Sequence, residues 1–220
     1  MNKSQLKMIL FVLVLGIITS GLLIGADALT KDRIAANEAY ELQSTILFGE
    51  TFNLNTINDV FEEKIEQHTF TIYQRISDET FSLTTFGEGV NQNVYEIILY
   101  AHDDGRFSFR FEGSGLWGPI IGILTLEADF ETINRITILE QQETPGLGGL
   151  VATRNFLDQF NGKSLLPSIE IIKNSNPDAA NEVDAITGAT GTSNAFARIL
   201  NAQYKLYLFA FEQLNGGDAS

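Results

Sequence analysis

The residues best suited to hold a charged ligand lie in one short stretch, Asp184–Ser193, with the sequence DAITGATGTS. Small and hydroxyl-bearing residues at the start of a helix leave backbone N–H groups uncovered, and the helix dipole favours an anion there. The stretch is therefore a candidate phosphate site. An ordinary helix start with Thr192 or Ser193 as N-cap explains the same residues. The lysine of a phosphate loop is missing from the stretch, so hydrolysis of nucleoside triphosphates is not supported.

Two glycine-rich segments precede this stretch. In Glu143–Gly149 (ETPGLGG), the glycines would allow the backbone to approach a flat ring closely, although a plain strand-to-helix turn is the alternative. They do not form a dinucleotide fingerprint, because its third glycine would fall at Val151. Gly113–Gly118 (GSGLWG) contains the only tryptophan of the chain, for which a core position beside a bulge is the alternative interpretation.

The amino-acid composition excludes several kinds of active site and partner. The chain has no cysteine, which excludes disulfides, thiolate metal sites and cysteine nucleophiles. Its two histidines, His68 and His102, lack metal-ligand spacing, so redox chemistry would need an organic cofactor. With 14 basic and 28 acidic residues the net charge is −14, which argues against nucleic acid as a partner.

The elements that must position these loops form an α+β pattern. Short aromatic and β-branched runs are separated by turn signals such as Asp104-Gly105, which is typical of antiparallel hairpins. Apolar residues spaced three and four apart predict a long final helix. The sequence thus predicts a largely antiparallel sheet flanked by helices, with strands at 69–76, 80–86, 94–100, 106–111, 119–128, 132–141 and finally 168–173, and helices at 153–163 and 192–214.

The N-terminal segment predicts a transmembrane helix. The 19 residues from Met8 to Ala26 carry no charge, and as a helix they would span roughly 28 Å, close to the ~30 Å of a hydrocarbon core. A signal peptide cleaved after Ala28 is the alternative. Lys3 and Lys7 precede the segment, which places the N-terminus in the cytoplasm and the remainder outside. We expect an anchor at 1–29, a helical stalk at 30–48 and a folded domain at 49–220.

Taken together, the segments resemble a known family. GSGLWGPI, EQQETPGLGG, NFLDQFNGK and DAITGATGTS occur in the order shared by the C subunit of the Na+-translocating NADH:quinone oxidoreductase and the G subunit of the ion-translocating Rnf complex. DAITGAT is similar to the flavinylation sequence Asp-x-x-Ser/Thr-Gly-Ala-Thr, in which a flavin transferase moves FMN from FAD onto the last threonine. The resemblance covers most of the chain and is weakest across residues 50–93.

The resemblance implies roles for particular residues. Thr190 would carry FMN as a covalent phosphoester, placed there by a flavin transferase with FAD as donor and Mg2+. Transferase recognition and the phosphate turn would use Asp184, Thr187, Gly188 and Ala189. The isoalloxazine ring would lie near Thr144, Gly146, Leu147 and Gly148, with Lys163 as a further candidate. The folded part would then be an FMN-binding domain.

The resemblance also implies a function. The chain would be an electron-transfer subunit without a complete active site of its own, working with other subunits of an ion-translocating redox complex. It would be a single-pass protein of the bacterial inner membrane with its domain on the extracytoplasmic side. Leu116-Trp117 favours the quinone-reductase family member, whereas Gly191, where an aliphatic residue is usual, and the short chain depart from it. The Rnf family member, a free-standing extracytoplasmic flavin carrier and a non-redox binding module remain alternatives.

Overall fold

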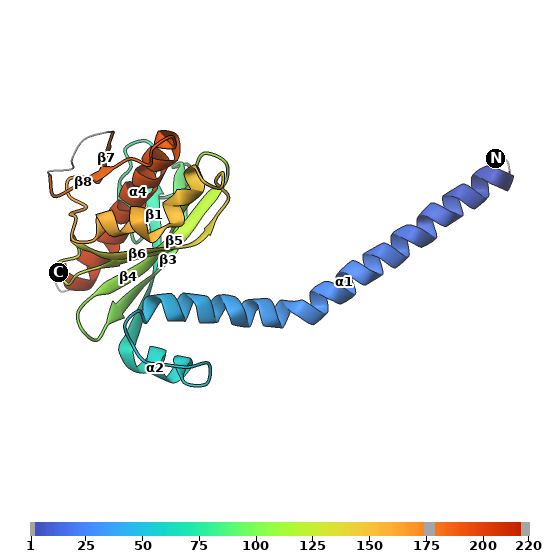
Figure 1. Ribbon diagram of the computed structural model, residues 1–220, viewed down its shortest axis with the longest axis horizontal. Coiled ribbons are helices and arrows are strands. Elements are labelled where there is room, and N and C mark those ends of the chain that lie inside the picture. Colours follow the sequence, from blue (N-terminus) through green and yellow to red (C-terminus); the bar gives the residue numbers. More distant parts are fainter. Residues whose placement is uncertain (1–2, 174–178, 217–220) are drawn as a thin grey trace. The chain divides into compact units, whose positions relative to one another are not determined.

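The structure, a computed structural model, describes residues 3–173 and 179–216 (Figure 1). It divides into two units at Ser44/Thr45, and each unit is described by itself.

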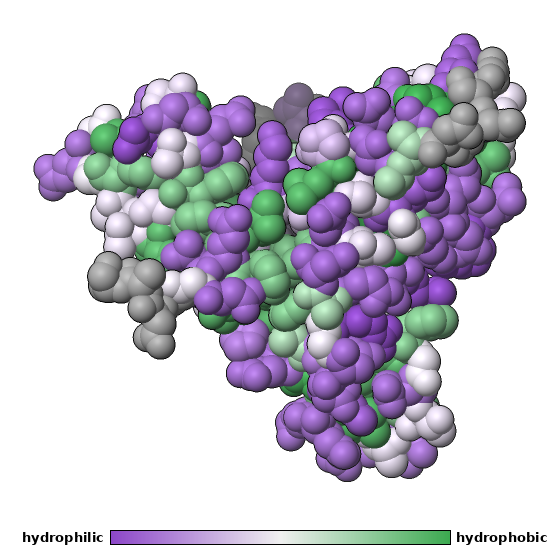
Figure 2. All heavy atoms as spheres, turned by 90° about the vertical axis from the view of Figure 1, so that its left-hand side faces the viewer, coloured by the Kyte–Doolittle hydropathy of each residue, from purple (hydrophilic) through white to green (hydrophobic). Residues whose placement is uncertain are grey.

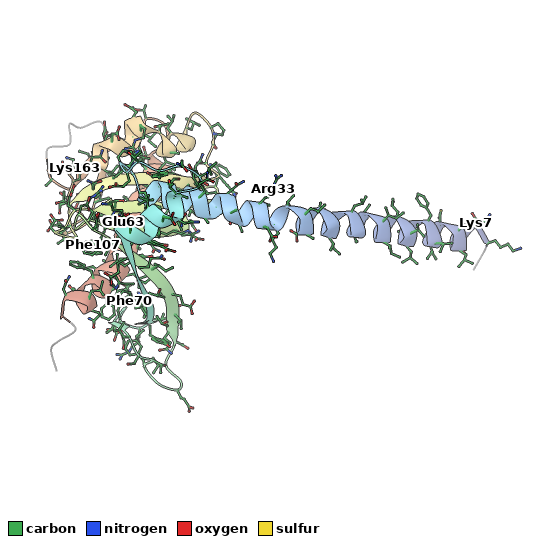
Figure 3. The ribbon with its side chains drawn as sticks, turned by 90° about the horizontal axis from the view of Figure 1, so that it is seen from below. Lys7, Arg33, Glu63, Phe70, Phe107 and Lys163 are labelled. Carbon is green, nitrogen blue, oxygen red and sulfur yellow. The ribbon has the colours of Figure 1, made fainter. Side chains whose placement is uncertain are left out.

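The first unit consists of the greater part of one helix, α1 (Lys3–Ile46). The predicted anchor and stalk are therefore parts of a single helix. The most apolar 18-residue stretch of α1 has a mean hydropathy of 2.6, and none of it is buried. Both features are consistent with a membrane anchor. The labelled side chains of Lys7 and Arg33 lie on either side of the apolar stretch (Figure 3). Where the helix ends, Ile46 is buried in the second unit.

The second unit is built on a six-stranded sheet, which confirms the predicted α+β class. Every strand pair in it is antiparallel, in the order β2-β1-β3-β4-β5-β6. The Asp104-Gly105 turn joins two neighbouring strands as predicted, with Gly105 at φ +90°. The strands are β1 (Ile65–Arg75), β2 (Phe81–Ser82), β3 (Gln92–His102), β4 (Phe107–Ser114), β5 (Pro119–Leu126) and β6 (Ile133–Gln141).

The remaining elements correct several predictions. The predicted helix at 153–163 is a short α3 (Arg154–Leu157) followed by a 3-10 turn, η2 (Asp158–Phe160), and a second 3-10 turn, η1 (Gly148–Ala152), precedes it. The strand predicted at 168–173 is β7 (Glu170–Ile172), but it is not the last. A further strand, β8 (Glu182–Asp184), pairs parallel with β7, and three residues are too few to show periodicity. The helix α2 (Ile57–Lys64) was not predicted.

The last helix, α4 (Thr190–Gly216), packs against β3, β4 and η1 (Figure 1). Aromatic rings fill this interface: Tyr207 stacks on Phe109 with ring centroids 4.0 Å apart, and Phe211 stacks on Phe130 at 4.1 Å. Phe107 (Figure 3) adds edge contacts to the rings of Phe130 and Phe211. Because these rings are largely removed from water, they anchor the helix on the sheet.

Side chains of α4 also bond to the backbone of β4. Gln203 Nε2 donates to the carbonyl of Glu112 at 3.2 Å, and the Tyr207 hydroxyl donates to that of Arg110 at 3.1 Å. Gly113 allows this close approach, since a Cβ there would lie 2.6 Å from Ile199 Cγ1. The start of α4 is thereby held beside the end of β4.

The surface reflects the acidic composition. The face shown in Figure 2 is mostly hydrophilic, with a band of apolar side chains across its middle. Partly buried side chains that pack on the core include Phe81 and Phe209, whose ring centroids lie 5.8 Å apart.

Candidate functional site

The candidate phosphate site forms the first turn of α4. The helix begins at Thr190, two residues before the predicted start, and its first i to i−4 bond runs from Ser193 N–H to the Ala189 carbonyl at 3.0 Å. A tight turn precedes it, in which Ala189 N–H donates to the Ile186 carbonyl at 2.9 Å and Gly188 takes φ +81°. Only a glycine adopts this backbone conformation without strain.

The predicted N-cap role of Thr192 and Ser193 is wrong, because both lie inside the helix. The Ser193 hydroxyl accepts from Ile186 N–H at 3.0 Å and donates to the Ala189 carbonyl at 3.1 Å. It therefore fastens the turn to the helix from within. Thr192 is 1% exposed and makes a different contact, described below.

Thr190 is left as the half-buried first residue of the helix, next to exposed Thr187 and Gly188. The N–H groups of Thr190, Gly191 and Thr192 precede the first intrahelical donor, so the helix itself gives them no acceptor. These donors and the helix dipole favour an anion beside the Thr190 hydroxyl. The geometry thus fits a phosphate at the predicted position.

A buried carboxylate, that of Glu143, joins the three segments singled out in the sequence. Its Oε1 accepts from the N–H of Leu116 at 2.7 Å and from that of Trp117 at 3.0 Å. Its Oε2 accepts from the Thr192 hydroxyl at 2.7 Å. One side chain that is 4% exposed therefore links the loop after β4, the loop after β6 and the first turn of α4.

The surroundings of Glu143 keep it ionised. Burial by itself raises the pKa of this carboxyl, but the Trp117 N–H, the Thr192 hydroxyl and the Leu116 N–H bond its charged form. These hydrogen bonds prevail and hold its pKa below the usual value. A negative charge thus stays in place near the start of α4.

Glycines leave the space in which this carboxylate sits. A Cβ on Gly148 would lie 2.6 Å from Glu143 Oε2 and 2.6 Å from Thr192 Oγ1, and one on Gly115 would clash with Glu143 Oε1. The sequence predicted that glycines allow a close approach by a flat ring. At Gly148 and Gly115 the structure shows close approach of the backbone to the Glu143 carboxylate.

Exposed apolar side chains come from the two loops that Glu143 joins to the start of α4. Leu116, Trp117 and Leu147 are 59%, 72% and 47% exposed. Leu147 Cδ2 lies 3.4 Å from a Cβ built on Gly188, just before α4. Leu116 Cδ2 lies 3.6 Å from one built on Gly191, in the first turn of the helix. The core interpretation of the tryptophan is therefore wrong. Clustered exposed apolar groups next to a phosphate seat suit a flat aromatic ligand that carries a phosphate.

The other predicted site residues lie as follows. Thr144 and Gly146 are exposed in the loop after β6, and the Thr144 carbonyl accepts from Leu147 N–H at 3.1 Å. Asp184 ends β8, where its N–H donates to Gln159 Oε1 at 3.2 Å. Lys163 lies just beyond η2 (Figure 3) and donates to the Ala179 carbonyl at 3.0 Å. Among the described residues, none of the hydrogen bonds made by Lys163 reaches the three joined loops.

Comparison with known proteins shows what this part of the chain is similar to. The profile of the FMN-binding domain matches residues 115–205. The C subunit of the Na(+)-translocating NADH-quinone reductase of Pasteurella multocida is 34% identical over 130 residues, which are 56% of this chain and 48% of that protein. Its counterpart in Neisseria meningitidis serogroup A is 26% identical over 211 residues, 82% of this chain and 81% of that one.

The fold agrees with solved structures. The crystal structure of Shewanella oneidensis NqrC superposes with a TM-score of 0.61 at 24% identity, covering 77% of this chain and 93% of that one. The corresponding Na(+)-translocating NADH-quinone reductase protein from Parabacteroides distasonis gives 0.58 at 21% identity, covering 78% and 92%. The match to the Pasteurella protein spans only about half of that protein's length. The resemblance predicted from the motifs is confirmed, and residues 115–205 match the FMN-binding domain family.

Proposed function

We propose that this chain is a membrane-anchored electron-transfer subunit that carries FMN, of the NqrC type found in Na+-translocating NADH-quinone reductases. The observation that carries the proposal is that the Glu143 carboxylate joins the loops after β4 and β6 to the first turn of α4, which begins at Thr190. Near this turn lie N–H groups that have no acceptor within the helix, the half-buried Thr190 hydroxyl and exposed apolar side chains, and this combination supports the proposal.

The residues fit the two chemically different ends of FMN. The uncovered N–H groups of Thr190 and Gly191 would hold the phosphate, and Leu116, Trp117 and Leu147 would contact the ring. When bound, FMN supplies the electron transfer, and the chain sets its position and its exposure to solvent. The residues themselves perform no redox chemistry.

We further propose that FMN is bonded through its phosphate to Thr190. In the reaction of a flavin transferase, the Thr190 hydroxyl oxygen attacks the FMN phosphorus of FAD, with Mg2+ present. A new oxygen–phosphorus bond forms, the bond to AMP breaks, and AMP leaves while the hydroxyl proton is lost. The half-buried position of Thr190 supports this choice over Thr192 and Ser193, whose hydroxyls are buried and hydrogen-bonded.

The position in the cell follows from the same reasoning. Helix α1 would hold the chain in a bacterial inner membrane, with the domain on the extracytoplasmic side and other subunits of a redox complex as partners. The Pasteurella and Neisseria relatives are C subunits of the Na(+)-translocating NADH-quinone reductase, which favours that complex over the Rnf complex and over a free-standing carrier.

Mass spectrometry tests the attachment. The full-length chain is incubated in detergent with flavin transferase, FAD and Mg2+, and its peptides are then mapped. We expect the peptide containing Asp184–Ser193 to gain the mass of FMN less water, with fragment ions that place the addition on Thr190. An addition on Thr187 would contradict the assignment.

Two matched variants complete the test. Thr190→Val keeps the shape of the side chain but removes the hydroxyl, so it should fold and carry no flavin that survives denaturation. Thr190→Ser restores a hydroxyl and should regain covalent flavin. If Thr190→Val retained covalent flavin, another residue would be the acceptor.

A further inference from the structure

We infer that Glu143 is the positioning residue of the site and arranges the loops around Thr190 before any flavin arrives. The inference rests on the proposed function, since it concerns the same site. It adds a role that neither the flavinylation motif nor the FMN-binding family match assigns to a particular side chain.

The geometry supports this role because the carboxylate connects distant parts of the chain. Its partners lie 27, 26 and 49 residues away in the sequence, at Leu116, Trp117 and Thr192. All three hydrogen bonds are 3.0 Å or shorter, and they use both carboxylate oxygens. Gly148 and Gly115 leave room for it, so the local sequence on both sides accommodates this side chain.

The hydrogen bonds act on the parts proposed to contact FMN. Leu116 and Trp117 are held by their backbone N–H groups, which leaves their apolar side chains free at the surface. Thr192 lies two residues after Thr190, so bonding its hydroxyl fixes the first turn that contains the acceptor. The Glu143 carboxylate thereby fixes the position of the apolar ring contacts relative to the Thr190 hydroxyl. Such positioning before the reaction is what preorganisation means.

Removing this carboxylate should loosen both the Leu116-Trp117 loop and the first turn of α4. In Glu143→Ala the two loop N–H groups and the Thr192 hydroxyl lose their acceptor. Glu143→Gln can still accept both N–H groups at its amide oxygen, while its NH2 donates to Thr192 Oγ1. A positioning role therefore predicts that glutamine restores what alanine loses.

The experiment uses two readouts on the full-length chain. Because Trp117 is the only tryptophan, its fluorescence anisotropy in the flavin-free protein reports the order of its loop. We expect lower anisotropy and stronger quenching by acrylamide in Glu143→Ala, with Glu143→Gln close to wild type. The rate of flavin attachment by flavin transferase should fall on the order of 10- to 100-fold in Glu143→Ala and recover in Glu143→Gln.

Two further variants keep the test decisive if Glu143→Ala folds poorly. Thr192→Val removes one donor to the carboxylate and should slow attachment, yet leave the mass addition on Thr190. Glu140→Ala removes an exposed carboxylate three residues away and should match wild type in both readouts. Failure of glutamine to restore a folded alanine variant, or unchanged readouts in folded Glu143→Ala and Thr192→Val, would overturn the inference.

The outcomes also separate this inference from the proposed function. If wild type takes up no flavin but Glu143→Ala alters the tryptophan signal, the proposed function fails and the positioning role stands. If wild type is flavinylated on Thr190 and the variants match it in both readouts, the proposed function stands and the positioning role fails.

Discussion

Acidification should destabilise the domain through His102, the largely buried last residue of β3. Its Nε2 lies 2.7 Å from Ser108 Oγ, and that hydroxyl lies 2.8 Å from Thr125 Oγ1. Burial, aided by nearby Arg106 and opposed by Asp104 and Asp103, lowers the pKa of His102 from 6.5 to about 4. The folded domain therefore holds this histidine neutral.

The sign and size of the effect follow from the two pKa values. Between pH 6.5 and about 4 the unfolded chain binds a proton on His102 that the folded chain does not. Stability from this group is complete above pH 6.5 and is lost as the pH falls toward 4. At about 1.4 kcal/mol per pH unit, roughly 2 kcal/mol is lost by pH 4.5.

The assay is urea unfolding of the full-length chain at pH 7 and pH 4.5, followed by near-ultraviolet circular dichroism of the packed aromatic rings. Other groups titrate in this range, so the comparison is with His102→Gln, which removes the titrating group. We expect wild type to lose roughly 2 kcal/mol more than this variant. His68→Gln controls for the replacement of a histidine. Equal losses in wild type and His102→Gln would refute the reasoning.

Three other outcomes are expected. Trp117→Ala removes an exposed side chain, so the free energy of unfolding should change by no more than about 0.5 kcal/mol. The potential and fluorescence of bound flavin should change, and unaltered values would contradict the proposed contact with the ring. Phe196→Ala removes a ring that is 0% exposed and should cost about 3–5 kcal/mol in urea unfolding; a cost below about 1 kcal/mol would contradict its core position. Protease added outside spheroplasts should degrade the domain, and complete protection would reverse the proposed orientation.

The sequence predicted helices and strands correctly where a repeating apolar pattern extends over many residues or where a turn has a distinctive dipeptide. The final helix was predicted because apolar residues repeat at helical spacing over more than five turns, and the hairpin at Asp104-Gly105 because that dipeptide suits a tight turn. β2 and β8 contain two and three residues, too few to show alternation. The predicted strand at 80–86 is accordingly much shorter in the structure.

At the site, residue types were easier to predict than their contacts. The Asp184–Ser193 stretch was recognised from its small residues and hydroxyls. The roles of Thr192 and Ser193 were predicted wrongly, because the helix starts two residues earlier than predicted and both side chains are therefore buried inside it. Glu143 was visible only as the first residue of a glycine-rich segment. Its hydrogen bonds to Leu116 and Thr192 cross 27 and 49 residues and depend on the complete fold.

The position of Thr190 results from two successive constraints. Packing and hydrogen bonds along β4 fix the axis of α4, as the stacked rings of Tyr207 and Phe109 and the bond from Gln203 to the Glu112 carbonyl show. A fixed axis alone leaves the loops around the first turn free to move. The carboxylate of Glu143 supplies the second constraint, because it bonds both a loop and that turn. The core therefore determines where the helix begins, and one buried charge determines what surrounds its first residue.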